Sequence, residues 1–283
     1  MNKDFCVFIM VHGRPDKMWT YQTLRNHGYT GKIYLLADNL DKSVEDYKNL
    51  YRDKLIIFDK KKASLKTDSG DNSGDLRGTI FASNVVFDIA RKNNFKYFCL
   101  MCDDYRAFEY RKIEKDKLLV KKIKNLDNVF KSLLKFLKNT KTHTIAFAQG
   151  GDFIGGAENK FAINGGLKRK AMNSFICSVD RPFKFMGRMN EDVSTYINLG
   201  SKGYLFFTTH LASLVQKPTQ LHKGGMTELY LDNGTYTKSF FSILYNPSCI
   251  KIAMMNTSHK RIHHSIKWIN AVPKILSEKF KKT

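Results

Sequence analysis

Long apolar runs without polar alternation mark the first half of the chain. Three of them are expected to form strands, at residues 5–11, 32–37 and 97–102. A run of this kind fits a strand that is buried on both faces of a mostly parallel sheet. Between them we expect a helix beginning near Asp16, helices at 41–51 and 79–92, and a short strand at 55–58. This alternation of strand and helix predicts an α/β domain of the kind that binds nucleotides.

In the second half of the chain, apolar residues recur at helical spacing, and the residues between them are largely basic. The expected elements are an amphipathic helix at 126–137, strands at 144–148 and 204–208, and a helix at 193–199 that stops at Gly200. The apolar residues from Ile262 to Leu276 are spaced for a helix that is interrupted near Pro273. The polar stretch at 59–78 predicts a loop, which at that length is usually functional or mobile.

The sign of the charge is the unusual feature of the composition. Of 283 residues, 48 are Lys or Arg and 26 are Asp or Glu, which leaves a formal net charge of +22. Residues 111–141 hold 11 basic and 3 acidic side chains, and residues 251–283 hold 8 and one. Such an excess favours a polyanionic partner, with nucleic acid ahead of an acidic membrane surface. A solvated Lys-rich face is the simpler alternative for either cluster.

Five cysteines stand mostly within apolar runs, at positions 6, 99, 102, 177 and 249. Their odd number and apolar surroundings predict buried thiols of a reduced, cytoplasmic protein. Cys99 and Cys102 have the spacing of a redox or zinc pair, but no second pair accompanies them. The amino terminus lacks signal-peptide features, and no apolar run approaches the roughly 18 residues that span a bilayer. A soluble intracellular protein is therefore expected.

Acidic residues follow the expected strands at their carboxyl ends. Asp38 follows the second strand, and Asp103 and Asp104 follow the strand at 97–102. Ligands of open α/β sheets bind at this edge, where two carboxylates can hold a hard divalent cation. A polar turn at the pair and an Asx-turn at Asp38 are the plain alternatives. The turn after the first strand, His12 to Pro15, matches neither the dinucleotide fingerprint nor the P-loop.

Further candidate residues lie in the polar segments. Arg77 and Asn84 flank the start of the helix at 79–92, where they could reach a diphosphate or serve as a surface Arg and a capping Asn. The glycine-rich segment 150–166 could let a backbone approach a ligand closely. Other candidates are the basic run Lys168, Arg169 and Lys170, the helix-start acids Glu191 and Asp192, and His222 with Lys223 in a polar segment.

Taken in order, the motifs HGRP, CDDY, NEDV and LHKGGMTE resemble a GT-A-type glycosyltransferase. More narrowly, they resemble the phage enzymes associated with TET/JBP-type base hydroxylases, which put sugars on hydroxymethylated DNA bases. The resemblance spans most of residues 5–230. It implies a mostly parallel, Rossmann-type sheet flanked by helices over residues 1–245. Residues 1–110 would bind the nucleotide sugar and residues 111–245 the acceptor, followed by a basic helical extension at 246–283.

The resemblance also implies roles for individual residues. Asp104 would bind Mn²⁺ or Mg²⁺, with Asp103 as a neighbour that touches the metal or ribose and His222 completing the metal shell. Cys102 stands where a fuller acidic motif would have another Asp. Asp192 would be the general base in an inverting enzyme, with Glu191 as helper or cap. The nucleotide-sugar site would comprise His12, Gly13, Arg14, Asp38, Arg77 and Asp103, and DNA would contact Lys168, Arg169, Lys170 and Lys223.

The function implied is metal-dependent transfer of glucose, arabinose or a similar sugar from a UDP-sugar to 5-hydroxymethylcytosine or 5-hydroxymethyluracil in DNA. The base would be flipped from a duplex, in the cytoplasm of a phage host, with no membrane span and no protein partner. Two alternatives stay open: a glycosyltransferase that acts on a polysaccharide or protein, and a nucleic-acid-binding protein without catalysis. The sugar, the base, the stereochemistry and the oligomeric state are not decided by these residues.

Overall fold

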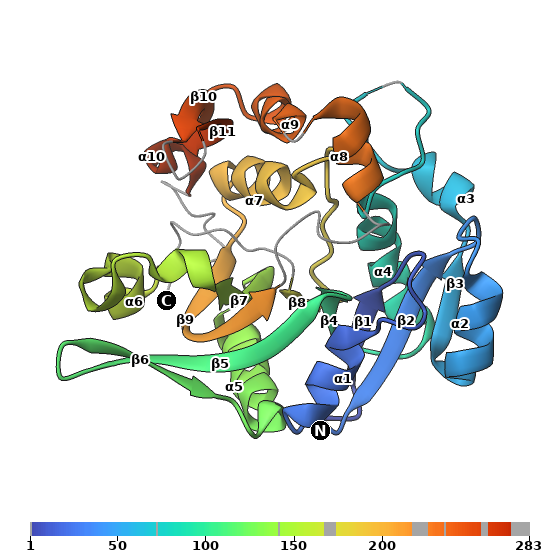
Figure 1. Cartoon of the computed structure of the whole chain (residues 1–283), viewed down its shortest axis with the longest axis horizontal. Helices are drawn as coiled ribbons and strands as arrows, with labels where there is room; N and C mark the ends of the chain where they lie inside the picture. Colours follow the sequence, from blue (N-terminus) through green and yellow to red (C-terminus); the bar gives the residue numbers. More distant parts are fainter. Residues whose placement is uncertain are drawn as a thin grey trace.

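A nine-stranded sheet forms the centre of the molecule in a computed structural model that describes residues 2–71, 73–140, 142–166, 174–216, 226–234, 236–255 and 260–272 (Figure 1). Its strand order is β3-β2-β1-β4-β8-β7-β9-β5-β6, and β8 and β5 run against the other strands. The strands are β1 Phe5–Met10, β2 Lys32–Asp38, β3 Leu55–Phe58, β4 Tyr97–Cys102, β5 Tyr105–Glu114, β6 Lys117–Lys122, β7 Thr144–Gln149, β8 Ser174–Ser178 and β9 Phe206–Gln216. The predicted α/β fold with a mostly parallel sheet is confirmed.

Helices cover both faces of this sheet (Figure 1). They are α1 Trp19–Asn26, α2 Val44–Tyr51, α3 Lys60–Ser64, α4 Ile80–Lys92, α5 Leu126–Thr140, α6 Lys160–Asn164, α7 Glu191–Ser201, α8 Thr227–Asn233, α9 Thr237–Tyr245 and α10 Trp268–Ala271. On β1, Phe5 and Val7 face the core cluster that contains residues of α1 and α5, whereas Cys6 and Phe8 face the cluster with α4 and α7. Burial on both faces explains why β1 lacks polar alternation.

Several predicted boundaries shift once the tertiary contacts are known. The first helix begins at Trp19 rather than near Asp16, because the chain turns at Arg14, whose carbonyl accepts from the backbone N–H of Lys17 at 3.1 Å. The helix predicted to stop at Gly200 runs on to Ser201. The predicted loop at 59–78 contains α3, whose first turn is capped by the side chain of Asp59.

The β5–β6 hairpin is absent from the sequence prediction. Its two turn residues, Lys115 and Asp116, both have positive φ, of 48° and 56°. Two-residue hairpins with such turns usually carry Asn and Gly, so the usual sequence signal is missing. The hairpin instead gains its order from β9, with which β5 pairs along Tyr105–Tyr110.

The C-terminal extension at 246–283, predicted to be helical, contains strands at Ile250–Met255 and Arg261–Ile266, and among its described residues only Trp268–Ala271 form a helix, α10. Strand β10 (Ile250–Met255) pairs antiparallel with β11 (Arg261–Ile266), so the helix predicted from Ile262 onward is wrong as far as Ile266. Isoleucines spaced four apart are compatible with a helix, but the same β-branched residues also pair well across strands. The buried Cys249, Ile250 and Ala271 join the core cluster on the α7 face of the large sheet.

Two further predictions concern whole classes of residue. All five cysteines are free, four of them buried and Cys102 half-buried, as predicted from their apolar surroundings. Within the described part of the chain, no helix has the length and apolar character needed to cross a bilayer.

Candidate active site

The carboxyl ends of β1, β2 and β4 meet at one edge of the sheet, as their parallel pairing requires. Arg14 follows β1 and donates from Nη2 to Oδ1 of Asp103, which follows β4, at 2.7 Å. The backbone N–H groups of Gly13 and Arg14 donate to Asp41 Oδ2 at 2.9 Å and to the Tyr47 hydroxyl at 3.0 Å. Asp41, just before helix α2, and Tyr47 within it therefore hold the HGRP turn beside the acidic pair.

Two carboxylate oxygens at this edge are buried without a hydrogen-bond partner among the described residues: Oδ2 of Asp103 and Oδ1 of Asp104. Burial raises the pKa of Asp103 to about 6, against the opposing charge of Arg14. Burial also raises the pKa of Asp104, although Gln216 Nε2 donates to its Oδ2 at 2.9 Å. Buried carboxylates seldom lack partners, so these oxygens fit a divalent cation, which prefers oxygen ligands.

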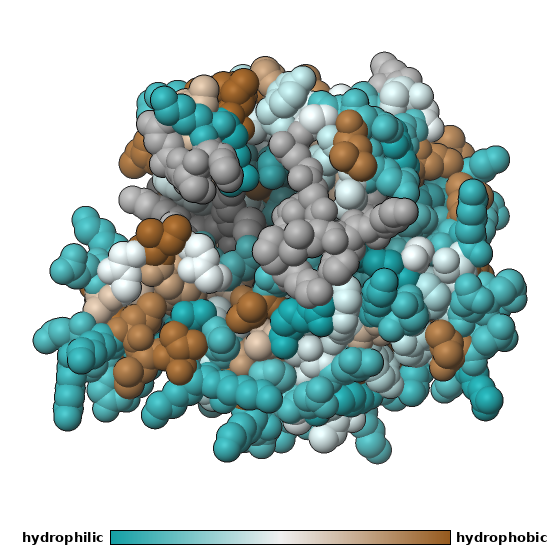
Figure 2. Space-filling model, in the orientation of Figure 1, coloured by the Kyte–Doolittle hydropathy of each residue, from teal (hydrophilic) through white to brown (hydrophobic). Residues whose placement is uncertain are grey.

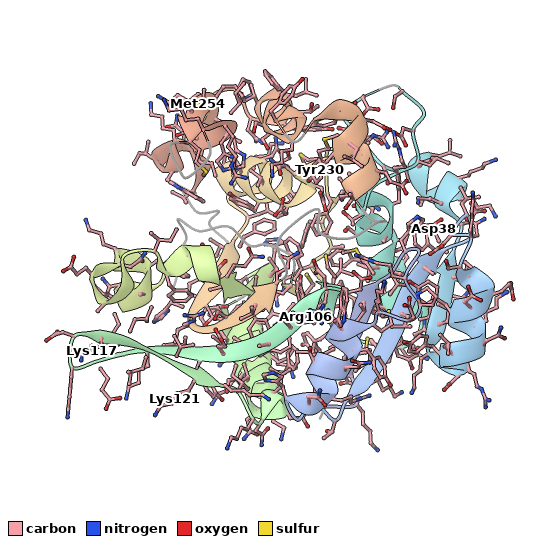
Figure 3. The ribbon with its side chains drawn as sticks, viewed as in Figure 1. Asp38, Arg106, Lys117, Lys121, Tyr230 and Met254 are labelled. Atoms are coloured by element: carbon pink, nitrogen blue, oxygen red, sulfur yellow. The ribbon has the colours of Figure 1, made fainter. Side chains whose placement is uncertain are left out.

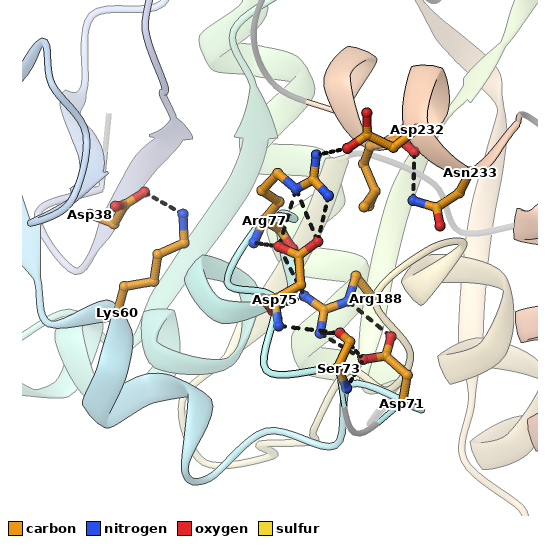
Figure 4. Close-up of polar contacts among 10 residues, drawn as sticks. Asp38, Lys60, Asp71, Ser73, Asp75, Arg77, Arg188, Asp232 and Asn233 are labelled. Carbon is orange, nitrogen blue, oxygen red and sulfur yellow. Dashed lines mark hydrogen bonds and ion pairs between the residues drawn. The ribbon is translucent and has the colours of Figure 1, made fainter.

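Asp38 lies at the end of β2 (Figure 3), and Figure 4 shows its contact with Lys60. Its Oδ2 lies 2.9 Å from Lys60 Nζ and 3.4 Å from His12 Nδ1. Its Oδ1 accepts from the backbone N–H of Leu40, so the Asx-turn expected as the simple alternative is present. Burial alone would raise the pKa of Asp38, but the bonds from His12 and Lys60 outweigh it and lower the pKa to about 2.

Glu191 and Asp192 open helix α7, with Glu191 Oε1 accepting from the hydroxyl of Thr79 beside α4. Burial, followed by the charge of Asp192, raises the pKa of Glu191 to about 7. Asp192 Oδ1 accepts from the backbone N–H of Val193 at 2.8 Å. Burial raises the pKa of Cys102, and the charges of Asp104, Asp103 and Glu191 add to this effect. The start of α7 thus lies near the acidic end of β4.

Arg77 lies outside this group and is held by acids (Figure 4). Its guanidinium donates to Asp75 Oδ2 at 2.7 Å and also to Asp232 on α8. Asn84 is buried, with an amide that bonds the backbone of Phe185 in both directions, so it is structural and does not cap a helix. Within the part of the chain that the structure describes, no hydrogen bond or ion pair joins Arg77 to Arg14 or Asp38, so the predicted nucleotide ligands do not all lie in one cluster.

Arg188, which the sequence did not single out, holds the segment before α4 in place. Only 3% of it is exposed, and it donates to Asp71 from Nε at 3.0 Å and from Nη2 at 2.9 Å. It also donates to the backbone carbonyls of Asp75 and Arg77. The polar stretch predicted to be functional or mobile is thus tied to the segment that leads into α7. Nothing local in the sequence distinguishes this Arg from a surface one.

Lys60 and Gln216 are the other residues that sequence reasoning missed. Lys60 stands in a run of three lysines, of which it alone is buried. Gln216 ends β9, and its Oε1 accepts from Gln149 at the end of β7, at 3.3 Å. Neighbouring strand ends place it beside Asp104, which only the strand order β7-β9-β5 reveals.

Five predicted site residues lie outside the described residues: Lys168, Arg169, Lys170, His222 and Lys223. Within the described ranges, no group of three or more His, Cys, Asp or Glu side chains is arranged to hold a metal. A metal at this edge would therefore depend on Asp103 and Asp104 together with groups from elsewhere.

Comparison with known proteins gives one family. The model of the family described as TET-Associated Glycosyltransferase matches residues 5–225. No protein of curated function matches the sequence.

Several solved structures resemble the chain at low identity. Glucosyl-3-phosphoglycerate synthase from Mycobacterium tuberculosis, in complex with Mg²⁺ and UDP, is 8% identical, with a TM-score of 0.46 over 93% of this chain and 87% of the other. The mannosyltransferase PcManGT from Pyrobaculum calidifontis, in complex with GDP-Man and Mn²⁺, is 10% identical, with a TM-score of 0.46 over 85% and 64%. S. aureus TarS 1–349 is 10% identical, with a TM-score of 0.42 over 86% and 66%.

Proposed function

Because the chain belongs to the TET-associated glycosyltransferase family, we propose that it moves a sugar from a UDP-sugar to the hydroxymethyl group of a 5-hydroxymethylpyrimidine in DNA. The observation that carries the proposal is the pair of partnerless buried oxygens on Asp103 and Asp104. They stand beside Arg14 at the edge of the sheet where ligands of α/β folds bind. The formal charge of +22 favours DNA as the acceptor.

The donor half of the site would be built at the ends of β1, β2 and β4. A Mn²⁺ or Mg²⁺ ion bound there would offset the charge that develops on the departing diphosphate. Asp104 and Asp103 would hold it, with His222 as a third candidate ligand. Arg14, which is 17% exposed at its side chain, would present a fixed positive charge to the diphosphate. His12, Gly13 and Asp38 would surround the nucleoside, and Arg77 is the outlying candidate.

The acceptor half would use the two acids at the start of α7. Burial and the charge of Asp192 raise the pKa of Glu191 to about 7, so Asp192 is the acid that we propose as acceptor of the proton of the acceptor hydroxyl. Glu191 would hold Asp192 in place through its bond from Thr79. Lys168, Arg169, Lys170 and Lys223 are proposed to contact DNA, with the target base flipped out of the duplex at a cost of about a few kcal/mol.

Mass spectrometry of nucleosides tests this function. Duplexes with 5-hydroxymethylcytosine or 5-hydroxymethyluracil are incubated with the protein, Mn²⁺ and one UDP-sugar at a time, and unmodified duplex serves as the control. We expect a mass gain of one sugar on the hydroxymethylated nucleoside alone. No gain with any donor, but transfer to a polysaccharide or protein, would support the second acceptor class. Duplex binding without any transfer or UDP-sugar hydrolysis would support a non-catalytic DNA-binding protein.

A further inference from the structure

The β5–β6 hairpin starts at the candidate active site and runs away from it along the edge of the sheet (Figure 1). Its first residue, Tyr105, follows Asp104 directly and pairs with Gln216, whose side chain bonds Asp104. The ten residues of β5 extend about 30 Å at about 3.3 Å per residue, close to the length of one turn of B-DNA. The hairpin thus forms an arm rooted beside the reacting groups.

The two faces of the arm differ in chemistry. Residues opposite each other in an antiparallel pair point to the same face, and Ile113 is paired with Leu118. Both pack against a small apolar cluster that contains Phe153 and Phe161 of the glycine-rich segment. Arg111 lies on the same face, 5.0 Å from the Phe153 ring, and its Nε donates to Ser213 Oγ at 2.9 Å. This inner face fixes the arm against the body of the protein.

The outer face is basic and has no cover among the described residues. It carries Lys121 opposite Tyr110, which is 42% exposed, and Lys117 opposite Glu114. Lys117 and Lys121 lie on the outer edge of the arm in Figure 3, and Figure 2 shows hydrophilic side chains along this margin of the molecule. The one acid on this face, Glu114, is bound by Lys112 at 3.7 Å.

The backbone conformation of Lys115 is unusual for its residue type. Lys115 is exposed at the tip of the arm with a φ of 48°, a left-handed conformation that costs a non-glycine residue free energy. Asn would fit this turn better. The tip of the arm thus carries an exposed basic side chain, Lys115, beside the exposed acid Asp116, whose φ is also positive at 56°.

We propose that the β5–β6 hairpin is a DNA-docking arm, whose Lys115, Lys117 and Lys121 bind the phosphate backbone of the duplex that flanks the target base. This inference rests on the proposed function, because it presumes DNA as the acceptor. The sign of the charge and the length of the arm suit a duplex, which presents one negative charge per about 1.7 Å of axis. Protection of the sheet edge by lysines is the competing explanation for β6.

Matched triple variants test the arm. The arm variant combines Lys115→Asn, Lys117→Gln and Lys121→Gln, and the first of these changes favours the existing turn, so a loss of binding does not reflect an unfolded hairpin. The control combines Lys131→Gln, Lys135→Gln and Lys138→Gln on the exposed face of α5, the basic face noted in the sequence. Both variants lose three positive charges, so the net field of the protein changes equally.

Fluorescence anisotropy with a labelled hydroxymethylated duplex gives Kd at several salt concentrations. We expect the arm variant to bind about tenfold more weakly near 0.15 M salt, and the slope of log K against log salt to fall by about 3, one for each lost phosphate contact. We expect the α5 control to stay within about twofold of the wild type, with an unchanged slope.

Two results would overturn the inference and leave the proposed function intact. One is an arm variant that transfers sugar and binds DNA as the wild type does. The other is an equal loss of duplex affinity in the arm variant and the α5 control. An arm variant that only self-associates, as size-exclusion chromatography would show, with unchanged DNA affinity of the monomer, would establish edge protection instead. A wild-type protein that binds no duplex would overturn the DNA acceptor and the arm together.

Discussion

At the scale of single residues, the site is defined by what its buried polar atoms lack. Asp103 and Asp104 are neighbours in sequence, but the fold gives them different partners. Asp103 is paired with Arg14, whereas Asp104 takes one neutral hydrogen bond from Gln216. Among the described residues no cationic side chain is hydrogen-bonded to Asp104, which agrees with the metal role that we propose for it.

Replacement of Asp104 by Asn tests this assignment. Asn keeps the size of the side chain but removes the charge that a divalent cation needs, so we expect kcat/KM for sugar transfer to fall by at least about 100-fold. Asp103→Asn is expected to lower kcat/KM and also to raise the KM for the donor, because the substitution removes the carboxylate that pairs with Arg14. Steady-state kinetics at several Mn²⁺ concentrations measure both effects. Asp53→Asn at an exposed position is the control, and wild-type activity in the Asp104 variant would refute the metal role.

The two acids at the start of α7 allow a second test. We expect Asp192→Asn to lower kcat for transfer by about 10²- to 10⁴-fold with little change in the KM for the donor, as for a general base. Glu191→Gln, which mimics the protonated state favoured by its raised pKa, is expected to lose less than about tenfold. The pH profile of kcat in each variant supplies the measurement. The roles are reversed if the Glu191 variant is the more damaged of the two.

At the scale of elements, one buried Arg holds the segment before α4 to the segment before α7. Arg188 bonds Asp71 through two nitrogens and the carbonyls of Asp75 and Arg77. Tyr245 of α9 adds a bond from its hydroxyl to Asp68 Oδ1 at 2.7 Å. Thr79, which donates to Glu191, comes directly after this segment. The bonds of Arg188 and Tyr245 therefore help to position Glu191 at the start of α7.

The hydrogen bonds between Arg188 and Asp71 predict that the free energy of unfolding depends on pH. Hydrogen bonds from Arg188 lower the pKa of Asp71 to about 2, below its value in the unfolded chain. The bonded carboxylate thus contributes stability, up to about 2 kcal/mol, that is fully present above about pH 4 and is lost as the pH falls toward 2. Urea unfolding between pH 6 and pH 2.5 gives the free energy of unfolding of the wild type and of Asp71→Asn. We expect the difference between these two free energies to narrow below about pH 4.

The control for this measurement is again the exposed Asp53→Asn, for which no such narrowing is expected. A difference between wild type and Asp71→Asn that stays constant over the whole range would show that the charge of Asp71 does not act through Arg188.

At the scale of the whole molecule, the metal site and the basic surface are separable. At the sheet edge Asp103 is buried and Asp104 is half-buried, whereas Lys115, Lys117 and Lys121 of the arm are exposed. We expect EDTA to reduce sugar transfer by at least about 100-fold and added Mn²⁺ to restore it. Duplex affinity, measured by anisotropy in the same buffers, is expected to change by less than about twofold. Sugar transfer that continues in EDTA would exclude a metal-dependent reaction. A loss of duplex affinity on removal of the metal would show that DNA binding depends on the ion.

The sequence by itself determined the elements whose pattern is local. The uninterrupted runs of β1, β2 and β4 marked strands buried on both faces, and the order of short motifs indicated the glycosyltransferase family that the match over residues 5–225 confirms. The carboxyl ends of parallel strands share one edge, so the sequence predicted that Arg14 and Asp103 lie at the same edge, whereas their contact depends on the pairing of β1 with β4.

Only the tertiary structure decided the rest, because those features depend on pairing between distant segments. The β5–β6 hairpin forms on β9 despite turn residues that disfavour it, and β10 pairs with β11 where the spacing of isoleucines suggested a helix. Likewise, Lys60, Arg188 and Gln216 become part of the site through burial and through partners far along the chain. A side chain that acts through such contacts leaves no periodic signal in the sequence.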